Sequence, residues 1–384
     1  MKQLHTILMG SAAMGLVALA TNPASAAEVK KSFKFSGQMN KAITFTNDGD
    51  STYRDFADPE NSKSRIRWIA EAKGPDYTIG GIVELGHWSN NGSRQSQTNN
   101  INGSSDGGTL QHRRLAVYVK SKQFGTINLG KYQTVSDGAA EADLSGTALS
   151  SFNGQYAGSG SVNSEADSGY RFIPDGSDGI VNDTAYPANS VTLMESMNAF
   201  DGRSRKDGIR YHSPRYMGFQ VGIGTAEGGE TDAAINYSSK VSGFKVLGRV
   251  AAWNMESIST GTDGGFAGSI SALHSSGISL TGSYGQQEMD SGARNDPDNL
   301  WLRVGYQFKA LGAGKTYLSG NWQQTDDQGA DGRQVTVWGG NIVQKLSAYG
   351  TEVYAGYANY ELNTNNATSY EDITQGWVGM RVKF

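Results

Sequence analysis

The chain ends on Gly376-Trp377-Val378-Gly379-Met380-Arg381-Val382-Lys383-Phe384. Every second residue of this stretch is apolar, which predicts a strand with one apolar face, formed by Val378, Met380, Val382 and Phe384. The opposite face carries Trp377, Arg381 and Lys383. Such a strand fits a barrel wall that faces lipid, and it equally fits a sheet packed on a water-soluble core. The ending alone therefore leaves both interpretations open.

The start of the chain indicates export from the cytoplasm. Residues 1–26 combine a positive Lys2, a short apolar run over 7–20 and the small-residue pattern Ala24-Ser25-Ala26. This is the pattern of a cleaved secretory signal peptide, and the apolar run is too short to span a bilayer comfortably. We expect the mature chain to begin at Ala27 and to consist of one domain over 27–384.

The composition narrows the class further. No later stretch approaches 18 consecutive apolar residues, so no membrane-spanning helix is expected. The hydrophobic share is 37%, below the globular norm of about 45–50%, which suits a chain that turns its apolar residues outward. Cysteine is absent, and the formal charge of −4 argues against nucleic acid as a partner.

Alternation of apolar and polar residues recurs from end to end. The segments are near the length that a tilted strand needs to cross a bilayer, which is about 9–11 residues. They number 16 and cover 33–45, 65–71, 76–88, 114–120, 124–133, 206–213, 217–226, 232–240, 243–255, 265–275, 277–288, 300–309, 314–325, 333–345, 350–362 and 374–384.

The connections between these segments alternate in length. Lys73-Gly74-Pro75-Asp76 and Ser242-Gly243 are tight, whereas 90–110 and 326–333 are long and polar. Short turns on one side and long loops on the other are typical of outer-membrane barrels. One connection, 135–204, is far longer than the rest. Loops beyond about 12–15 residues are usually functional or disordered, so this segment is either a disordered insertion or a loop folded inward to narrow a pore.

These features together predict a transmembrane antiparallel β-barrel. In hydrocarbon every backbone polar group must be paired within the protein, and a closed barrel is the only strand-based solution. At 16 strands side chains cannot fill the interior, so water enters. The polar faces of the strands then need no protein partner.

Several stretches resemble the general diffusion porins of Gram-negative bacteria, especially the alphaproteobacterial type. They occur in the family's order along the chain: Phe35-Ser36-Gly37-Gln38-Met39-Asn40-Lys41-Ala42, Phe124-Gly125-Thr126-Ile127-Asn128-Leu129-Gly130-Lys131, Arg210-Tyr211-His212-Ser213-Pro214 with Gly218-Phe219, and the terminal Phe384. The resemblance implies a 16-stranded barrel in the cell outer membrane, in contact with lipid and lipopolysaccharide. It also implies a homotrimer, and a C-terminal strand whose Phe384 is recognised by the barrel assembly machinery.

The same resemblance implies a water-filled channel for passive diffusion of small hydrophilic solutes and ions. The long third loop, here 135–204, would fold into the pore and filter solutes by size and charge. The family's Pro-Glu-Phe-Gly-Gly loop tip is not found in this chain, and Phe152-Asn153-Gly154 is the nearest stretch.

The residues expected to carry selectivity follow from this placement. The basic wall of the constriction is expected to contain Arg65, Arg67, Arg114 and Arg210. The facing loop is expected to contribute the acidic residues Asp137, Glu141, Asp143, Glu165 and Asp167. Opposed carboxylate and guanidinium groups can orient dipolar solutes and bias ions by charge. Because acids outnumber bases on the loop, we expect a weak cation preference.

Other functions remain as alternatives. A substrate-specific, sugar-type channel would use an aromatic slide, for which Tyr156, Tyr170, Phe172 and Tyr186 are candidates. A barrel hydrolase would need a nucleophile paired with a histidine, and no such motif is present, so no enzymatic activity is expected. An adhesive surface β-protein would need apolar faces that pack sheet on sheet. The acid-rich Asp175-Gly176-Ser177-Asp178-Gly179 lacks the calcium-loop pattern, and neither a metal nor another cofactor is expected.

Overall fold

The computed structural model describes residues 28–90, 92, 95–97, 110–153, 155–156, 169–177, 186–255, 261–290, 292 and 294–384. The expected signal peptide at 1–26 lies outside these residues. Among the described residues, no helix has the length and apolar character needed to cross a membrane.

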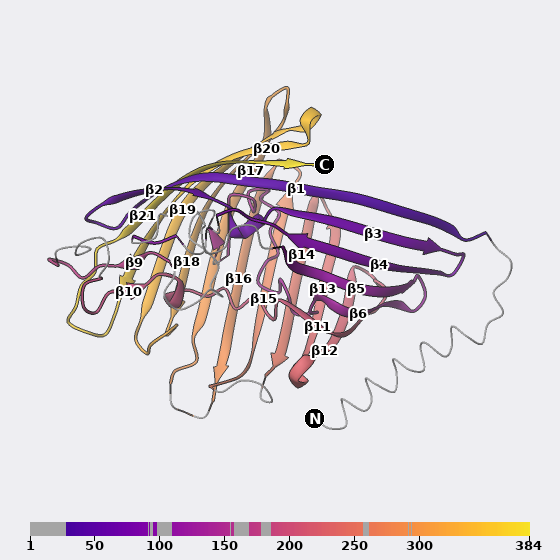
Figure 1. Ribbon diagram of the computed structural model, residues 1–384, viewed down its shortest axis with the longest axis horizontal. Helices are drawn as coiled ribbons and strands as arrows, with labels where there is room; N and C mark the ends of the chain where they lie inside the picture. The colour runs from indigo at the N-terminus through magenta and orange to yellow at the C-terminus, as the bar shows by residue number, and fades with distance from the viewer. Residues whose placement is uncertain are drawn as a thin grey trace.

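A single large antiparallel sheet dominates the molecule and closes on itself (Figure 1). Within the described residues it contains 17 strands. Of these, β2 (Thr52–Ala57) pairs with β1 alone, and the other 16 form the barrel wall. The wall strands are β1 Lys30–Asn47, β3 Arg65–Lys73, β4 Tyr77–Gly86, β5 Gln111–Ser121, β6 Gly125–Gln133, β11 Arg205–His212, β12 Phe219–Ala226, β13 Thr231–Val241, β14 Phe244–Asn254, β15 Thr262–His274, β16 Ile278–Met289, β17 Asp298–Leu311, β18 Gly314–Asp326, β19 Gln334–Leu346, β20 Thr351–Asn363 and β21 Ile373–Lys383. The expected fold class and strand number are confirmed.

The two ends of the chain close the barrel. β1 pairs with β21 from Gln38↔Lys383 to Asn47↔Thr374. One step further, Gly37 and Phe384 exchange two backbone hydrogen bonds of 2.8 and 3.1 Å. The Phe384 ring covers Gly37 so closely that a side chain there would collide with it. The terminal strand is thus a full member of the wall, with no unpaired edge left between β1 and β21.

On the edge of β1 opposite β21, the partner strand is divided into two pieces, β2 and β3. The sequence pattern did not reveal this interruption. The first half of β1 pairs with β3, and its second half pairs with the short β2. Residues 58–64 lie between these partners and include Pro59 and the 3₁₀ turn η1 (Glu60–Ser62). Proline lacks an N–H group and therefore cannot donate to a continuous ladder. The interruption leaves Asn61 free to donate to the carbonyls of Ala148 and Leu149 in the long loop.

Exposure along the strands shows which face meets lipid. In β17, Leu302 and Val304 are 47% and 53% exposed, whereas Arg303 between them is 3% exposed. Exposure alternates in the same way along β5, where Leu115 and Val117 are exposed while Ala116 and Tyr118 are buried. Apolar side chains on the outside and polar side chains on the inside are the arrangement of a barrel in a bilayer.

Turns at one end of the barrel are short, as the sequence predicted. β13 and β14 are joined by Ser242 and Gly243 alone, whose φ angles of 48° and 83° are both positive. Positive φ at both central residues is the type I′ turn, whose twist matches that of the two strands it joins. Longer segments join strands at the other end, among them residues 327–333 and 364–372, although the 3₁₀ turn η4 (Glu227–Gly229) there makes a short connection between β12 and β13.

Candidate functional site

Four arginines converge on one buried glutamate at the inner wall. Glu84 of β4 is fully buried, and its carboxylate lies 2.5 Å from a terminal nitrogen of Arg67 and 2.9 Å from Nε of Arg113. Nη1 atoms of Arg65 and Arg114 lie 3.8 and 3.7 Å from the same carboxylate. A buried carboxylate held by several guanidinium groups forms strong charge-assisted hydrogen bonds. Of the four expected wall arginines, the structure brings Arg65, Arg67 and Arg114 together here.

A β-bulge explains why two adjacent arginines serve the same site. Alternation sends consecutive side chains to opposite faces, so the sequence predicted an inward position for Arg114 only. In the ladder between β4 and β5 the register shifts between Glu84↔Arg114 and Leu85↔His112. Arg113 is the extra residue, and its side chain reaches the Glu84 carboxylate beside that of Arg114. Bulges commonly redirect side chains in this way near functional sites.

Arg210 lies next to this cluster but has a different set of partners. Its guanidinium donates to the backbone carbonyls of Gly130 at 2.8 Å, Lys206 at 3.2 Å and Gln133. Its central carbon lies 5.4 Å from the Tyr132 ring, and that of Arg114 lies 5.0 Å from the same ring. Arg210 thus joins β11 to β6 at the base of the long loop and is 3% exposed.

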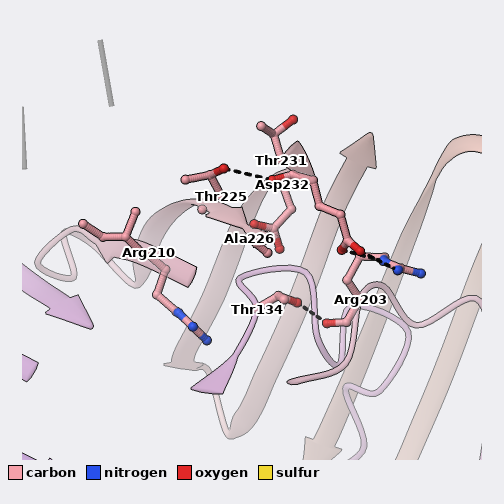
Figure 2. A pocket seen from close by; sticks show the side chains of 10 residues that line it. Thr134, Arg203, Arg210, Thr225, Ala226, Thr231 and Asp232 are labelled. Carbon is pink, nitrogen blue, oxygen red and sulfur yellow. Dashed lines mark hydrogen bonds and ion pairs between the residues drawn. The ribbon is translucent and has the colours of Figure 1, made fainter. Parts of the chain in front are cut away.

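The two ends of the long loop are fastened together at the barrel wall (Figure 2). Thr134 donates a side-chain hydrogen bond to the backbone carbonyl of Arg203, and the Arg203 N–H donates to Oγ of Ser136 at 3.0 Å. The Arg203 side chain binds both oxygens of Glu230 at 2.8 and 2.9 Å. Ser136 in turn donates from its N–H and its hydroxyl to Asp232 of β13, both at 2.8 Å.

We call the point where residues 134–136 are hydrogen-bonded to Arg203 the neck of the loop. Two of the expected loop acids, Asp137 and Glu141, follow it in the sequence. Burial, followed by the charge of Asp201, raises the pKa of Asp137 to about 6, although Arg205, Arg114 and Arg113 act in the opposite direction. Burial also raises the pKa of Glu141 well above its usual value, and the charge of Asp201 and a hydrogen bond to it add to the effect. Close carboxyl groups in such a setting share a proton because two adjacent negative charges repel.

Asp143 has a partner that the sequence did not indicate. Its carboxylate lies 2.9 Å from Nη1 of Arg303, and the two side chains are 2% and 0% exposed. The Arg303 guanidinium also donates to the backbone carbonyl of Ser151 at 3.1 Å and to Oγ of Thr147 at 3.2 Å. The charge of Asp143 is therefore neutralised within a packed contact between the loop and β17.

Further hydrogen bonds join the loop to inward-facing residues of later strands. The Ala142 N–H donates to Oγ of Ser269 at 2.8 Å, and the hydroxyls of Thr147 and Ser319 lie 2.7 Å apart. Ser150 is joined to two more strands. It donates to Asn341 at 2.9 Å and accepts from Nε1 of Trp377 at 2.8 Å.

The second half of the loop packs through apolar side chains. It contains β9 (Arg171–Phe172), β10 (Val191–Thr192) and the 3₁₀ turn η3 (Met194–Ser196), whereas β7 (Ser151–Phe152) and β8 (Gln155–Tyr156) precede it. Tyr170 and Phe172 are 2% and 0% exposed in a cluster with residues of β19, β20 and β21. Aromatic rings buried in this way are closed to solutes. Two of the expected site residues, Glu165 and Asp167, lie outside the described residues.

Sequence reasoning missed several charged residues of the site, among them Glu84, Arg113, Arg205 and Arg303. Glu84 and Arg303 both lie at inward positions of recognised strands, so alternation was a sufficient signal for them. The inward position of Arg113 depends on the bulge, and the alternation of apolar and polar residues gives no sign of that bulge. Arg205 begins β11, and its charge acts on Arg65, Arg113 and Arg114. Only the fold brings it to this group.

A closed 16-stranded barrel with an apolar outer face and a charged inner wall defines an outer-membrane channel protein. The chain belongs to the Gram-negative porin family, whose model matches residues 11–365. It forms a general diffusion channel in the outer membrane of a Gram-negative cell, as the sequence predicted.

Solved structures agree with this fold. OmpT, an outer membrane protein of Vibrio cholerae, has a TM-score of 0.58 at 13% identity, over 94% of this chain and all of its own length. An anion-selective porin from Comamonas acidovorans has a TM-score of 0.58 at 15% identity, over 92% of this chain and all of its own. A mutant of the Rh. blastica porin has a TM-score of 0.54 at 14% identity, with the same two coverages. No curated protein matches the sequence.

Proposed function

We propose that loop 135–204 lies within the barrel and forms the constriction that filters solutes by size and charge. The observation that carries the proposal is the set of hydrogen bonds from loop residues to inward side chains of β15, β18, β19 and β21. Their partners are Ser269, Ser319, Asn341 and Trp377. A loop held at so many points on the polar face narrows the lumen and leaves the arginine cluster on the opposite side.

The charged residues of the constriction then have distinct roles. Arg65, Arg67 and Arg114 form its basic wall, joined by Arg113, while Arg210 supports the base of the loop. Asp137 and Glu141 lie on the loop side, and Glu165 and Asp167 are proposed to belong to it as well. Asp143 serves to hold the loop through Arg303, so its contribution to the field in the pore is small.

Engineered disulfides test where the loop lies, and the chain has no cysteine of its own to interfere. The Thr147 and Ser319 hydroxyls are 2.7 Å apart, so Thr147→Cys with Ser319→Cys is expected to oxidise to a cross-link in folded protein. The matched control pairs Thr147→Cys with Leu318→Cys, on the outer face. Cross-linking of the control pair, or none in the first pair, would contradict an inward loop.

Single-channel conductance in a planar bilayer tests the channel itself. We propose that the protein assembles as a homotrimer, so conductance steps are expected in groups of three. We also propose that it has no enzymatic activity, that it contacts lipopolysaccharide, and that the barrel assembly machinery recognises its last strand through Phe384. A sugar-type channel is disfavoured, because two of the four candidate slide residues, Tyr170 and Phe172, are buried in an apolar cluster.

A further inference from the structure

The charges that face each other across the proposed constriction are not balanced. On the loop side, Asp143 is neutralised by Arg303 in a contact closed to water. Glu141 is hydrogen-bonded to Asp201, and burial beside a second carboxyl group favours its protonated form. Of the three loop acids that the structure describes among those expected, only Asp137 lies where its charge acts on the arginine wall.

The wall side carries an excess of positive charge. Arg65, Arg67, Arg113 and Arg114 share the single carboxylate of Glu84. Arg205 adds a fifth guanidinium, and its Nε has no hydrogen-bond partner in the part of the chain that the structure describes. The Nε of Arg114 is likewise unpaired among these residues. Five positive groups therefore face three negative ones, Glu84, Asp137 and the neighbouring Asp201.

We propose that these five arginines form a docking site for small oxyanions, the carboxylate or phosphate groups of passing solutes, and that the channel favours anions over cations. The proposal rests on the proposed placement of the cluster at the constriction. This anion preference is the opposite of the weak cation preference expected from the sequence. That expectation used only the number of acidic residues on the loop and not their positions relative to the arginines.

The chemistry of the cluster suits such solutes. Guanidinium groups present pairs of N–H donors that match the two oxygens of a carboxylate or phosphate. Arg67 is the most accessible of the four arginines bound to Glu84, with a side chain 30% exposed. Glu84 keeps the cluster assembled without cancelling its charge. Because water still reaches the site, an anion is held weakly enough to leave, as conduction requires.

Reversal potentials in a KCl gradient test the sign of the preference. The native channel is expected to pass Cl⁻ more readily than K⁺. Arg67→Gln and Arg205→Gln are each expected to lower the Cl⁻/K⁺ permeability ratio by about twofold, the effect of one unit charge acting through water at lumen distances. Lys245→Gln, which removes the same charge from an exposed position near the short turn between β13 and β14, is the matched control and is expected to leave the ratio unchanged. A preference for K⁺ in the native channel would overturn the proposal.

Inorganic phosphate tests docking separately. Added to a KCl solution, it is expected to reduce chloride current in a saturable manner, and Arg67→Gln should weaken this block severalfold. Arg67→Lys keeps the charge but loses the paired donors, so it should keep the anion preference and still weaken the block. Phosphate without effect on the native channel would refute the docking site. Folded protein that conducts no ions at all would refute the proposed channel function instead.

Discussion

Nη1 of Arg303 and Oδ2 of Asp143 lie 2.9 Å apart, although the two residues are 160 positions apart in the chain. Both side chains are almost fully withdrawn from water. The contact joins the long loop to β17. Because an isolated buried charge is far more costly than a buried pair, each residue depends on the other.

Breaking this pair is expected to destabilise the protein strongly. Asp143→Asn leaves the Arg303 guanidinium buried and unpaired, at a cost of about 3–5 kcal/mol in the free energy of unfolding. Guanidinium chloride unfolding in detergent, followed by tryptophan fluorescence, measures it. The double variant Asp143→Leu with Arg303→Leu should recover much of the loss. Equal stability of Asp143→Asn and the native chain would show that the pair does not hold the loop.

Glu84→Gln is expected to loosen the arginine cluster. The change keeps the size of the side chain but removes the negative charge shared by four guanidinium groups, so they repel one another. We expect a lower unfolding midpoint, together with a higher Cl⁻/K⁺ permeability ratio in the channels that do fold. Glu71→Gln is the control. Glu71 is partly exposed beside a single cation, Lys120, at 3.3 Å, and a glutamine there can still accept the hydrogen bond from the Tyr118 hydroxyl, so it should change the midpoint little. A midpoint of Glu84→Gln as high as that of the control would contradict this role.

Gly146 tests the close approach of the loop to the wall. Its φ is +87°, and a Cβ atom there would lie 2.0 Å from the Tyr317 ring. Gly146→Ala therefore adds a collision to backbone strain. Gly176 also has positive φ, at +72°, but has open space around it, so Gly176→Ala reports the strain alone. We expect Gly146→Ala to lower the unfolding midpoint clearly more than Gly176→Ala. Equal midpoints would mean that the loop can move away from the Tyr317 ring without loss of stability.

Acidic pH is expected to tighten the neck of the loop. The pKa of Asp137 is raised from 3.8 to about 6, and that of Glu141 is also raised. The folded state therefore binds protons more tightly than the unfolded state, and this stabilisation is present below about pH 4 and lost as pH rises through 6. The groups that face these carboxyls are Asp201, Arg249, Arg205, Arg114 and Arg113.

Open-channel current noise measures this effect, since a looser loop fluctuates more. Noise in the native channel is expected to rise between pH 5 and pH 7. Glu141→Gln, which keeps a hydrogen-bond donor toward Asp201 at every pH, should reduce the rise. Noise that falls with rising pH in the native channel would reverse the sign of the argument.

Much of the fold followed from the sequence because alternation is a local property. Each of the 16 segments contained its own period of two, and most of their boundaries agree with the strands to within a few residues. The interrupted second strand escaped detection, since β2 has only six residues and pairs through a short part of β1. The inward position of Arg65, Arg67 and Arg114 also followed from alternation.

The sequence by itself determined that this chain forms a barrel and which face of each strand meets lipid. The tertiary structure alone decided which charges meet. The bulge at Arg113 shifts one side chain to the inner face, and the course of the loop pairs Asp143 with Arg303 while Glu141 meets Asp201. The physical reason is that the sign and strength of a pore's field depend on distances between side chains far apart in sequence, and these distances exist only once the barrel has closed.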